Sequence, residues 1–204
     1  MDRLDQVLAT AGPLLRRVDD LLATAGAPAD HAMWGELRRV RLLPGAAAEA
    51  VASLRPSAFA DAVPELRAVA RACVDTAADL PEPGEWTGDA ADAYEDVRRR
   101  AAADLSGGGE SLDERLEATA DLAQALTDWM AETRGGLAAA LATVLTSGEA
   151  LTLSAATAAP APSVAETDAA ADVAELVLRT IADNYAEAFD LLQGSRDLAK
   201  PVPM

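Results

Sequence analysis

Few side chains in this sequence could carry out chemistry. The chain has one histidine, His31, and one cysteine, Cys73, so a Ser-His-Asp or Cys-His arrangement has a single candidate base. The two residues are far apart in the chain, and neither lies in a recognisable nucleophile motif. The aspartates and glutamates mostly fall between apolar positions of expected helices, which is typical of a solvated helix face. The sequence therefore predicts no catalytic residues and no enzyme activity.

The sequence also predicts no cofactor and no metal site. It contains no Cys-x-x-Cys, glycine-rich phosphate loop, dinucleotide fingerprint or calcium loop. A di-iron helical bundle needs two Glu-x-x-His motifs, which a chain with one histidine cannot supply. Cys73 falls on the apolar face of its expected helix, where we expect a small core residue.

The charge of the chain limits its partners. The formal net charge is −17, from 34 acidic and 17 basic residues. Nucleic-acid binding depends on neutralising phosphates, so this balance argues against DNA and RNA. It argues equally against electrostatic attachment to anionic membranes. The main role of the charge is then expected to be solubility.

The elements that hold any functional residue are expected to be helices. Hydrophobic residues make up 50% of the 204 residues, yet only 3% are aromatic, and alanine dominates the apolar set. Alanine has the highest helix propensity, and its small side chain permits close packing of helices. Alternating β-branched and polar runs, which would indicate strands, are missing. We therefore expect an all-α fold, an elongated antiparallel helical bundle.

The most informative stretch is 81–94, which predicts a helix end, a turn and a new helix. Pro81 disfavours helical geometry at the residue before it, so the preceding helix should end near position 80. Thr87 is the expected cap of the next helix. Gly88, which has no Cβ, is expected to let two backbones pass closely. The result should be a helical hairpin with Trp86 at its tip.

This turn resembles a known family. Trp86-Thr87-Gly88 between two helices, followed by Ala90-Ala91-x-Ala93-Tyr94, is similar to the Trp-x-Gly (WXG) superfamily of type VII (ESX) secretion substrates. The resemblance covers residues 61–105 and suggests an elongated member distantly like PPE-type substrates. It implies that Trp86, Thr87, Gly88 and Tyr94 form an interaction motif rather than a catalytic one.

The resemblance also implies a two-part export signal, of which only one part is present. The second part would be Tyr-x-x-x-Asp/Glu, but Tyr94 is followed by Arg98 and Tyr185 by Phe189. The expected partner is therefore a helical protein. It could be a small partner that supplies the tyrosine signal in a heterodimer, or a further copy in a homo-oligomer. Alternatively, the extra helices of this chain could cover the hairpin in a monomer.

Other functions remain open at this stage. The protein could be exported without a classical signal peptide, which the N-terminus lacks, or be cytoplasmic before export. It could instead be a non-secreted acidic adaptor or an immunity-type scaffold. A weaker alternative is a membrane-active assembly that uses residues 137–159, where Glu149 opposes insertion. Trp86 itself could recognise a partner or close the hairpin as an apolar plug.

The expected organisation has four consecutive segments within one continuous domain. Residues 1–56 should form short helices packed on the bundle, 57–106 the hairpin, 107–194 a long helix and a C-terminal helix, and 195–204 a flexible tail. The long helix should begin at a capping box, Ser111-x-x-Glu114, and run unbroken to about position 158. Its expected weak point is Gly135-Gly136. The last helix should begin at Ser163-x-x-Glu166 and end at Gly194.

Finer packing is also predicted. Residues 2–25 form one helical stripe, which Gly12-Pro13 should kink or split. The two arms of the hairpin should face each other along apolar stripes, with Arg98–Arg100 on the outside. The predicted inner residues are Leu66, Val69, Ala70, Cys73, Ala77, Leu80, Ala90, Ala93, Tyr94, Val97, Ala101 and Leu105.

Overall fold

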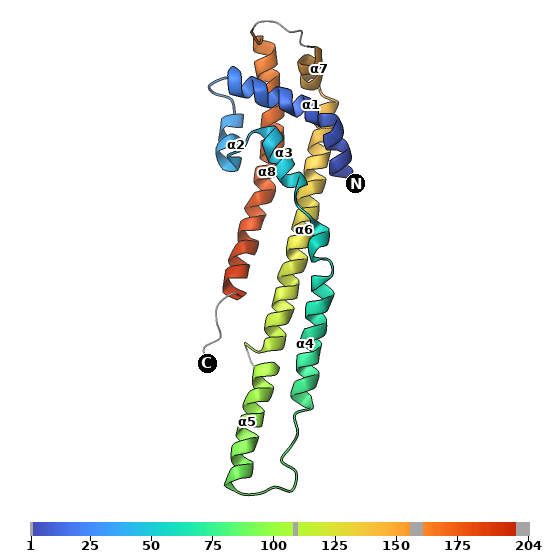
Figure 1. The fold of residues 1–204 in the computed structure, drawn as a ribbon. Helices are drawn as coiled ribbons and strands as arrows, with labels where there is room; N and C mark the ends of the chain where they lie inside the picture. The colour runs from blue at the N-terminus through green and yellow to red at the C-terminus, as the bar shows by residue number, and fades with distance from the viewer. Residues whose placement is uncertain (1, 108–109, 156–160, 199–204) are drawn as a thin grey trace. The chain divides into compact units, whose positions relative to one another are not determined.

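The structure is a computed structural model that describes residues 2–107, 110–155 and 161–198. In these ranges the chain forms helices packed as a bundle and no strand, so the all-α prediction is confirmed. Figure 1 shows the helices. In chain order they are α1 (Arg3–Thr24), α2 (Met33–Val40), α3 (Pro44–Ala52), the short 3-10 helix η1 (Pro56–Phe59), α4 (Ala62–Ala78), α5 (Asp89–Leu105), α6 (Leu112–Leu145), α7 (Gly148–Ala155) and α8 (Val164–Leu198).

The helices belong to two compact units. The first unit combines Met1–Arg55 with Trp129–Phe189, and the second combines Pro56–Asp128 with Asp190–Met204. The helices α6 and α8 each contribute to both units. Segments that are distant in the sequence therefore share one core.

The first unit has the large hydrophobic core. Its buried side chains come from α1, α2, α3, α6, α7 and α8, and many are alanines, which lets the helices approach closely. The helix α1 packs on α3 and on α7. It continues through Gly12-Pro13 as one helix, so of the predicted kink or split the split does not occur. Its N-terminus is held by a capping box between Asp2 and Asp5.

A buried arginine connects three segments of the first unit. The side chain of Arg134, on α6, is only 8% exposed. It forms hydrogen-bonded ion pairs with Asp2 and Asp5 at the start of α1. Its guanidinium also donates to the carbonyls of Ala52 and Leu54, at 2.5 and 3.0 Å, where α3 ends. Because a buried charge is costly unless its donors are satisfied, this network fixes α1 and α3 against α6.

A second polar contact places the start of α3. The backbone N–H of Gly45 donates to the carboxylate of Asp19 on α1, at 3.0 Å. Burial raises the pKa of Asp19, although its hydrogen bonds to the backbone of α3 act against this shift. Because an ideal Cβ on Gly45 would come within 2.5 Å of this carboxylate, only glycine allows this close approach.

Within the first unit, α6 packs closely on α8. The indole N–H of Trp129 donates to the carbonyl of Asn184 at 2.8 Å, and its ring meets Tyr185 edge-on. Gly135-Gly136, the predicted weak point, does not interrupt α6. A Cβ on Gly136 would lie 3.6 Å from the Asn184 side chain, which shows how closely α8 covers this position.

The predicted long helix is broken at Leu145, about three and a half turns before its expected end near position 158. The helix α6 ends at Leu145 and α7 begins at Gly148, with a bend of 63° between them. The Thr146 hydroxyl donates to the carbonyls of Ala142 and Thr143, and the Ser147 hydroxyl accepts from the N–H of Ala150. These hydroxyls compete with the helical hydrogen bonds and cap the new helix. Positions 156–158 lie outside the described residues.

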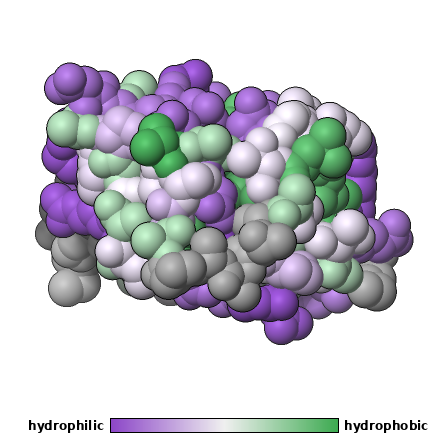
Figure 2. Space-filling view, turned by 90° about the horizontal axis from the view of Figure 1, so that it is seen from above, coloured by the Kyte–Doolittle hydropathy of each residue, from purple (hydrophilic) through white to green (hydrophobic). Residues whose placement is uncertain are grey.

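No single helix among the described residues is long and apolar enough to cross a membrane. The bent pair α6 and α7 would pass that test together, by length and composition alone. Figure 2 looks at the end of the first unit where α7 and the start of α8 lie, and it shows apolar patches between hydrophilic ones. Leu151 of α7 and Val164 of α8 are strongly exposed. Apolar surface on this unit is therefore not confined to its core.

The last helix begins where the sequence predicts but ends later. Ser163 and Glu166 form the predicted capping box, with backbone-to-side-chain bonds of 2.8 and 3.2 Å. The side chain of Glu166 is further held by Arg17 of α1, at 2.8 Å. Gly194 does not stop the helix, which runs to Leu198, so 195–198 are helical rather than a tail. Residues 199–204 lie outside the described residues.

In the second unit, α4 pairs with α6 as well as with α5. Val63 and Leu66 of α4 form a small core with Ala120 and Ala123 of α6. Arg67 adds ion pairs to two carboxylates of α6. Beyond this region α4 contacts α5, and α5 continues past the end of α4 (Figure 1). The two arms are thus offset, whereas the sequence predicted arms that face each other throughout.

Candidate interaction site at the turn between α4 and α5

The turn of the second unit, residues 79–88, forms with the first residues of α5 a region that we name the tip. The chain turns where the N–H of Trp86 donates to the carbonyl of Pro83 at 3.2 Å, and Gly84 has a positive φ of 62°. The helix α5 then begins at Asp89. Its N-cap residue is Gly88 and no side chain caps it, so the prediction that Thr87 is the cap is wrong.

Gly88 is required by the backbone rather than by neighbouring atoms. Its φ is 95°, a conformation that side chains with a Cβ rarely adopt. Its carbonyl accepts from the N–H groups of Ala91 and Asp92, at 2.8 and 3.1 Å, and so starts the helix. Apart from its chain neighbours, no atom of the described residues lies within 4 Å of where its Cβ would be, so the predicted close approach of two backbones is wrong. The glycine therefore sets the angle at which the chain enters α5.

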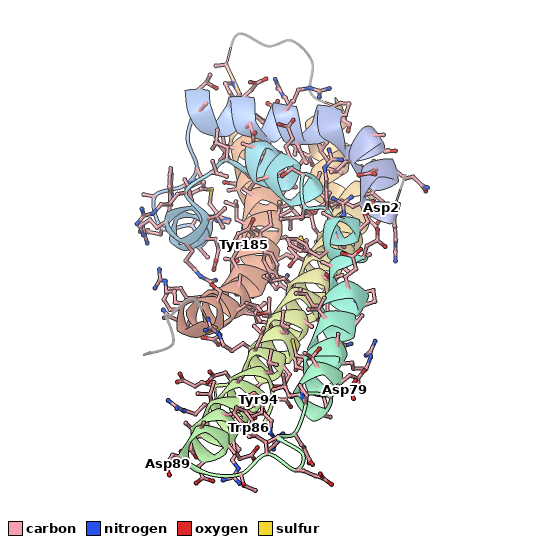
Figure 3. The ribbon with its side chains drawn as sticks, turned by 60° about the horizontal axis from the view of Figure 1, so that its bottom comes forward. Asp2, Asp79, Trp86, Asp89, Tyr94 and Tyr185 are labelled. Atoms are coloured by element: carbon pink, nitrogen blue, oxygen red, sulfur yellow. The ribbon has the colours of Figure 1, made fainter. Side chains whose placement is uncertain are left out.

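Trp86 and Tyr94 are in contact at the tip, as Figure 3 shows. Their ring centroids are 5.8 Å apart with an interplanar angle of 46°. The Tyr94 hydroxyl donates to the carbonyl of Pro81 at 2.7 Å, which ties α5 to the turn. Trp86 is nevertheless 53% exposed. The indole therefore contacts the Tyr94 ring while about half of its surface stays open to solvent.

The structure therefore brings together three of the four predicted motif residues and gives each a part. Tyr94 supports Trp86, and Gly88 sets the turn that carries it. Thr87 is exposed and makes no side-chain hydrogen bond among the described residues. The predicted alternative of a buried apolar plug does not describe an indole that is half exposed.

The face of α5 that turns inward is shifted by about one residue from the prediction. Val97, predicted to lie inside, is 57% exposed, and Arg98, predicted to lie outside, is half-buried. Arg98 donates two hydrogen bonds of 2.7 Å to the carboxylate of Glu95, and Arg99 donates a third of 2.8 Å. The hydrogen bonds from Arg98, and then those from Arg99, lower the pKa of Glu95 to about 2.

The surface around Trp86 is acidic. The exposed carboxylates at the tip belong to Asp79, Glu82, Glu85, Asp89 and Asp92, and none of them forms an ion pair within the part of the chain that the structure describes. Figure 3 shows Asp79 and Asp89 at the two sides of the turn. Asp89 and Asp92 lie in the first turn of α5, where the helix dipole favours negative charge. The tip thus presents one aromatic side chain in a negative field.

A separate cluster in the first unit has the residue types of a metal site. The ligand atoms of His31, Asp172 and Glu175 lie within 4.8 Å of one another. However, the N–H of Met33 donates to Nδ1 of His31 at 3.1 Å, which leaves the proton on Nε2, 3.1 Å from Asp172. Glu175 is also paired with Arg179. Because both imidazole nitrogens are already used, this histidine links the α1–α2 connection to α8, a role the sequence did not indicate.

Cys73 is buried on α4, in agreement with its predicted packing role. The sequence also missed an apolar groove on the first unit, because its walls come from segments more than 130 positions apart.

In the comparisons with known proteins, no family model, no curated protein and no solved structure matches this chain. The fold and the site therefore define only a class of protein. It is an all-α bundle protein with a half-exposed tryptophan, in contact with a tyrosine, on an acidic turn.

Proposed function

We propose that this protein acts through protein–protein contacts made by the tip, as a substrate or an associated helical protein of a type VII (ESX-like) secretion system. The observation that carries the proposal is the half-exposed Trp86, held in place by Tyr94. Resemblance to the Trp-x-Gly superfamily supplies the secretion context, and the elongated antiparallel arrangement expected of the whole chain belongs to the same proposal.

The proposal is supported by the free energy that is forgone when a large apolar side chain stays in solvent. A half-exposed tryptophan gains only part of the free energy of burial within the chain, whereas tryptophan and tyrosine are enriched among the residues that dominate binding at protein interfaces. The contact with Tyr94 and the bond from Tyr94 to Pro81 restrict the turn before binding. Because less freedom remains to be lost, a partner would bind a prepared surface at lower entropic cost.

The partner class follows from what the chain lacks. No tyrosine in the sequence is followed four positions later by an acidic residue, so a Tyr-x-x-x-Asp/Glu signal would have to come from another chain. We expect a small helical protein that supplies this signal and buries Trp86 in the complex. Contact with nucleic acid is not part of the proposal, because the net charge of −17 opposes it.

Co-expression with the small helical proteins encoded beside its gene tests the proposal. The wild type should co-purify with one of them, Trp86→Ala should lose it, and Trp86→Phe should keep part of the binding. Val97→Ala is the matched control, because Val97 is an equally exposed apolar residue of α5 outside the tip. Unchanged co-purification of a folded Trp86→Ala variant would refute the role of the tip.

Export separates this function from a non-secreted adaptor or immunity-type scaffold. In a host with an active type VII system, the protein should reach the medium only when the partner is co-expressed, and Trp86→Ala should stay in the cell. A protein that binds its partner through Trp86 yet is never exported would be an adaptor.

A further inference from the structure

The first unit carries an open apolar groove of about 380 Å³ between α2, α3 and α8. Its lining is mostly aliphatic and includes one aromatic ring, contributed by Val40, Leu42, Ala47, Ile181, Ala182 and Tyr185. Leu42 and Tyr185 are each 43% exposed, and Phe189, one turn beyond Tyr185 on α8, is 59% exposed. Large apolar side chains left in solvent around a groove mark a binding surface.

The α2 edge of this groove is basic. Arg38, Arg39 and Arg41 stand in or next to the last turn of α2, and all three are exposed. Arg39 lines the groove and is paired with Glu36 and Asp183. Arg38 and Arg41 have no ion pair among the described residues. In a chain of net charge −17, this edge is a local site for an acidic ligand.

The tip has the complementary chemistry. It offers one large aromatic side chain, and the carboxylates beside it have no ion pair among the described residues. A groove of this volume is large enough for an indole, and Tyr185 and Phe189 provide aromatic surface beside it. The carboxylates on both sides of Trp86 would then face the α2 arginines. The edge of the groove carries the positive charge that the tip lacks, and the tip carries a large side chain that the groove could hold.

We propose that the groove receives the tip of a second copy of this chain, so that copies associate head to tail. This inference rests on the proposed function, because it takes the tip as the contact surface. Since one Trp86 can be buried in only one contact at a time, the second copy and the small helical partner would compete for the tip. The contact is heterologous, since it joins two different surfaces, and successive copies would form a chain or a closed ring.

Sedimentation or light scattering over a concentration series tests the proposal. The wild type should form species larger than one chain, and Trp86→Ala should weaken association by about tenfold or more, as expected for a buried tryptophan anchor. Ala186 lines the groove and is exposed, so Ala186→Glu should repel the acidic tip. Ala186→Lys, of similar size and opposite charge, should weaken association much less.

Mixing two defective variants is the decisive measurement. Trp86→Ala keeps an intact groove and Ala186→Glu keeps an intact tip, so two monomeric variants should combine as a 1:1 dimer that grows no further. The inference is overturned if the wild type stays a monomer at every concentration, or if both variants associate like the wild type. A monomer that still captures its co-expressed partner through Trp86 would overturn this inference alone and leave the proposed function standing.

Discussion

The hydroxyl of Tyr94 donates a hydrogen bond of 2.7 Å to the backbone carbonyl of Pro81. The bond joins the second turn of α5 to Pro81, three residues after the end of α4, and the Tyr94 ring is in contact with Trp86. One side chain thus both closes the turn and supports its exposed tryptophan. We therefore expect this bond to restrict the position of Trp86.

Removing the bond should loosen the tip while the fold remains. We expect Tyr94→Phe to keep the ring contact with Trp86 and to cost about 1 kcal/mol, the usual net worth of one hydrogen bond. Amide hydrogens of residues 79–88 should exchange faster, and partner binding should weaken several-fold. Exchange measured by mass spectrometry checks this. Unchanged exchange in the turn would contradict the role given to the bond.

Gly88 should be difficult to replace although space around it is free. Its φ of 95° is unfavourable for any residue with a Cβ, so Gly88→Ala should destabilise the second unit by about 1–2 kcal/mol. The matched control is Gly135→Ala, in the interior of α6 with no atom near its Cβ, which should stabilise by up to about 1 kcal/mol. Chemical denaturation of both variants gives the comparison. Equal effects would show that the backbone angle is not the reason for the glycine.

Among the charged side chains of the first unit, Arg134 should cause the largest loss of folding stability when it is removed. Arg134→Ala would leave two carboxylates without their counter-ion and several carbonyls at the end of α3 without a donor. We expect a loss of about 2–4 kcal/mol, because the partners of the buried guanidinium, above all the carbonyls at the end of α3, would be left unpaired. Arg134→Lys should recover only part of it, since lysine lacks the planar fork. Arg16→Ala, on the exposed side of α1, is the control and should change stability little.

Acid should weaken the second unit through Glu95. The folded-state pKa of Glu95, about 2, lies below its ordinary value of 4.5. Its contribution is therefore fully present above pH 4.5 and is lost as the pH falls toward 2. Wild type should exceed Glu95→Gln in stability at neutral pH, and the difference should vanish near the lower value. Melting curves followed by circular dichroism across this range check the sign. A constant difference would contradict it.

Thr133 offers a stabilising change. Its hydroxyl is the buried side-chain polar atom that lacks a hydrogen-bond partner in the described part of the chain. Thr133→Val keeps the shape and removes the unsatisfied group, so stability should rise by about 1 kcal/mol. Thr127→Val is the control, because the Thr127 hydroxyl donates to the Ala123 carbonyl and its loss should destabilise. A melting temperature that falls in both variants would indicate an undetected partner of Thr133.

The sequence by itself determined the all-α class and most helix boundaries. Alanine-rich stripes with a helical period and no alternating runs leave helices as the only regular structure. Local signals such as the Ser163–Glu166 capping box act within one turn, so they can be recognised without a tertiary context. The interruption after α4 was predictable for the same reason, because proline restricts its own neighbour.

The tertiary structure decided everything that depends on contacts between distant residues. It gave α4 a partner in α6 as well as in α5, and turned Val97 outward while Arg98 turned inward. Placing Tyr94 under Trp86, or Arg134 among groups from three segments, requires positions in space that periodicity does not encode. The groove is the same case, since α2, α3 and α8 meet only when the chain folds. Local propensity indicates most of the places where helices begin and end, but side-chain packing selects which faces are buried and which stay free to bind.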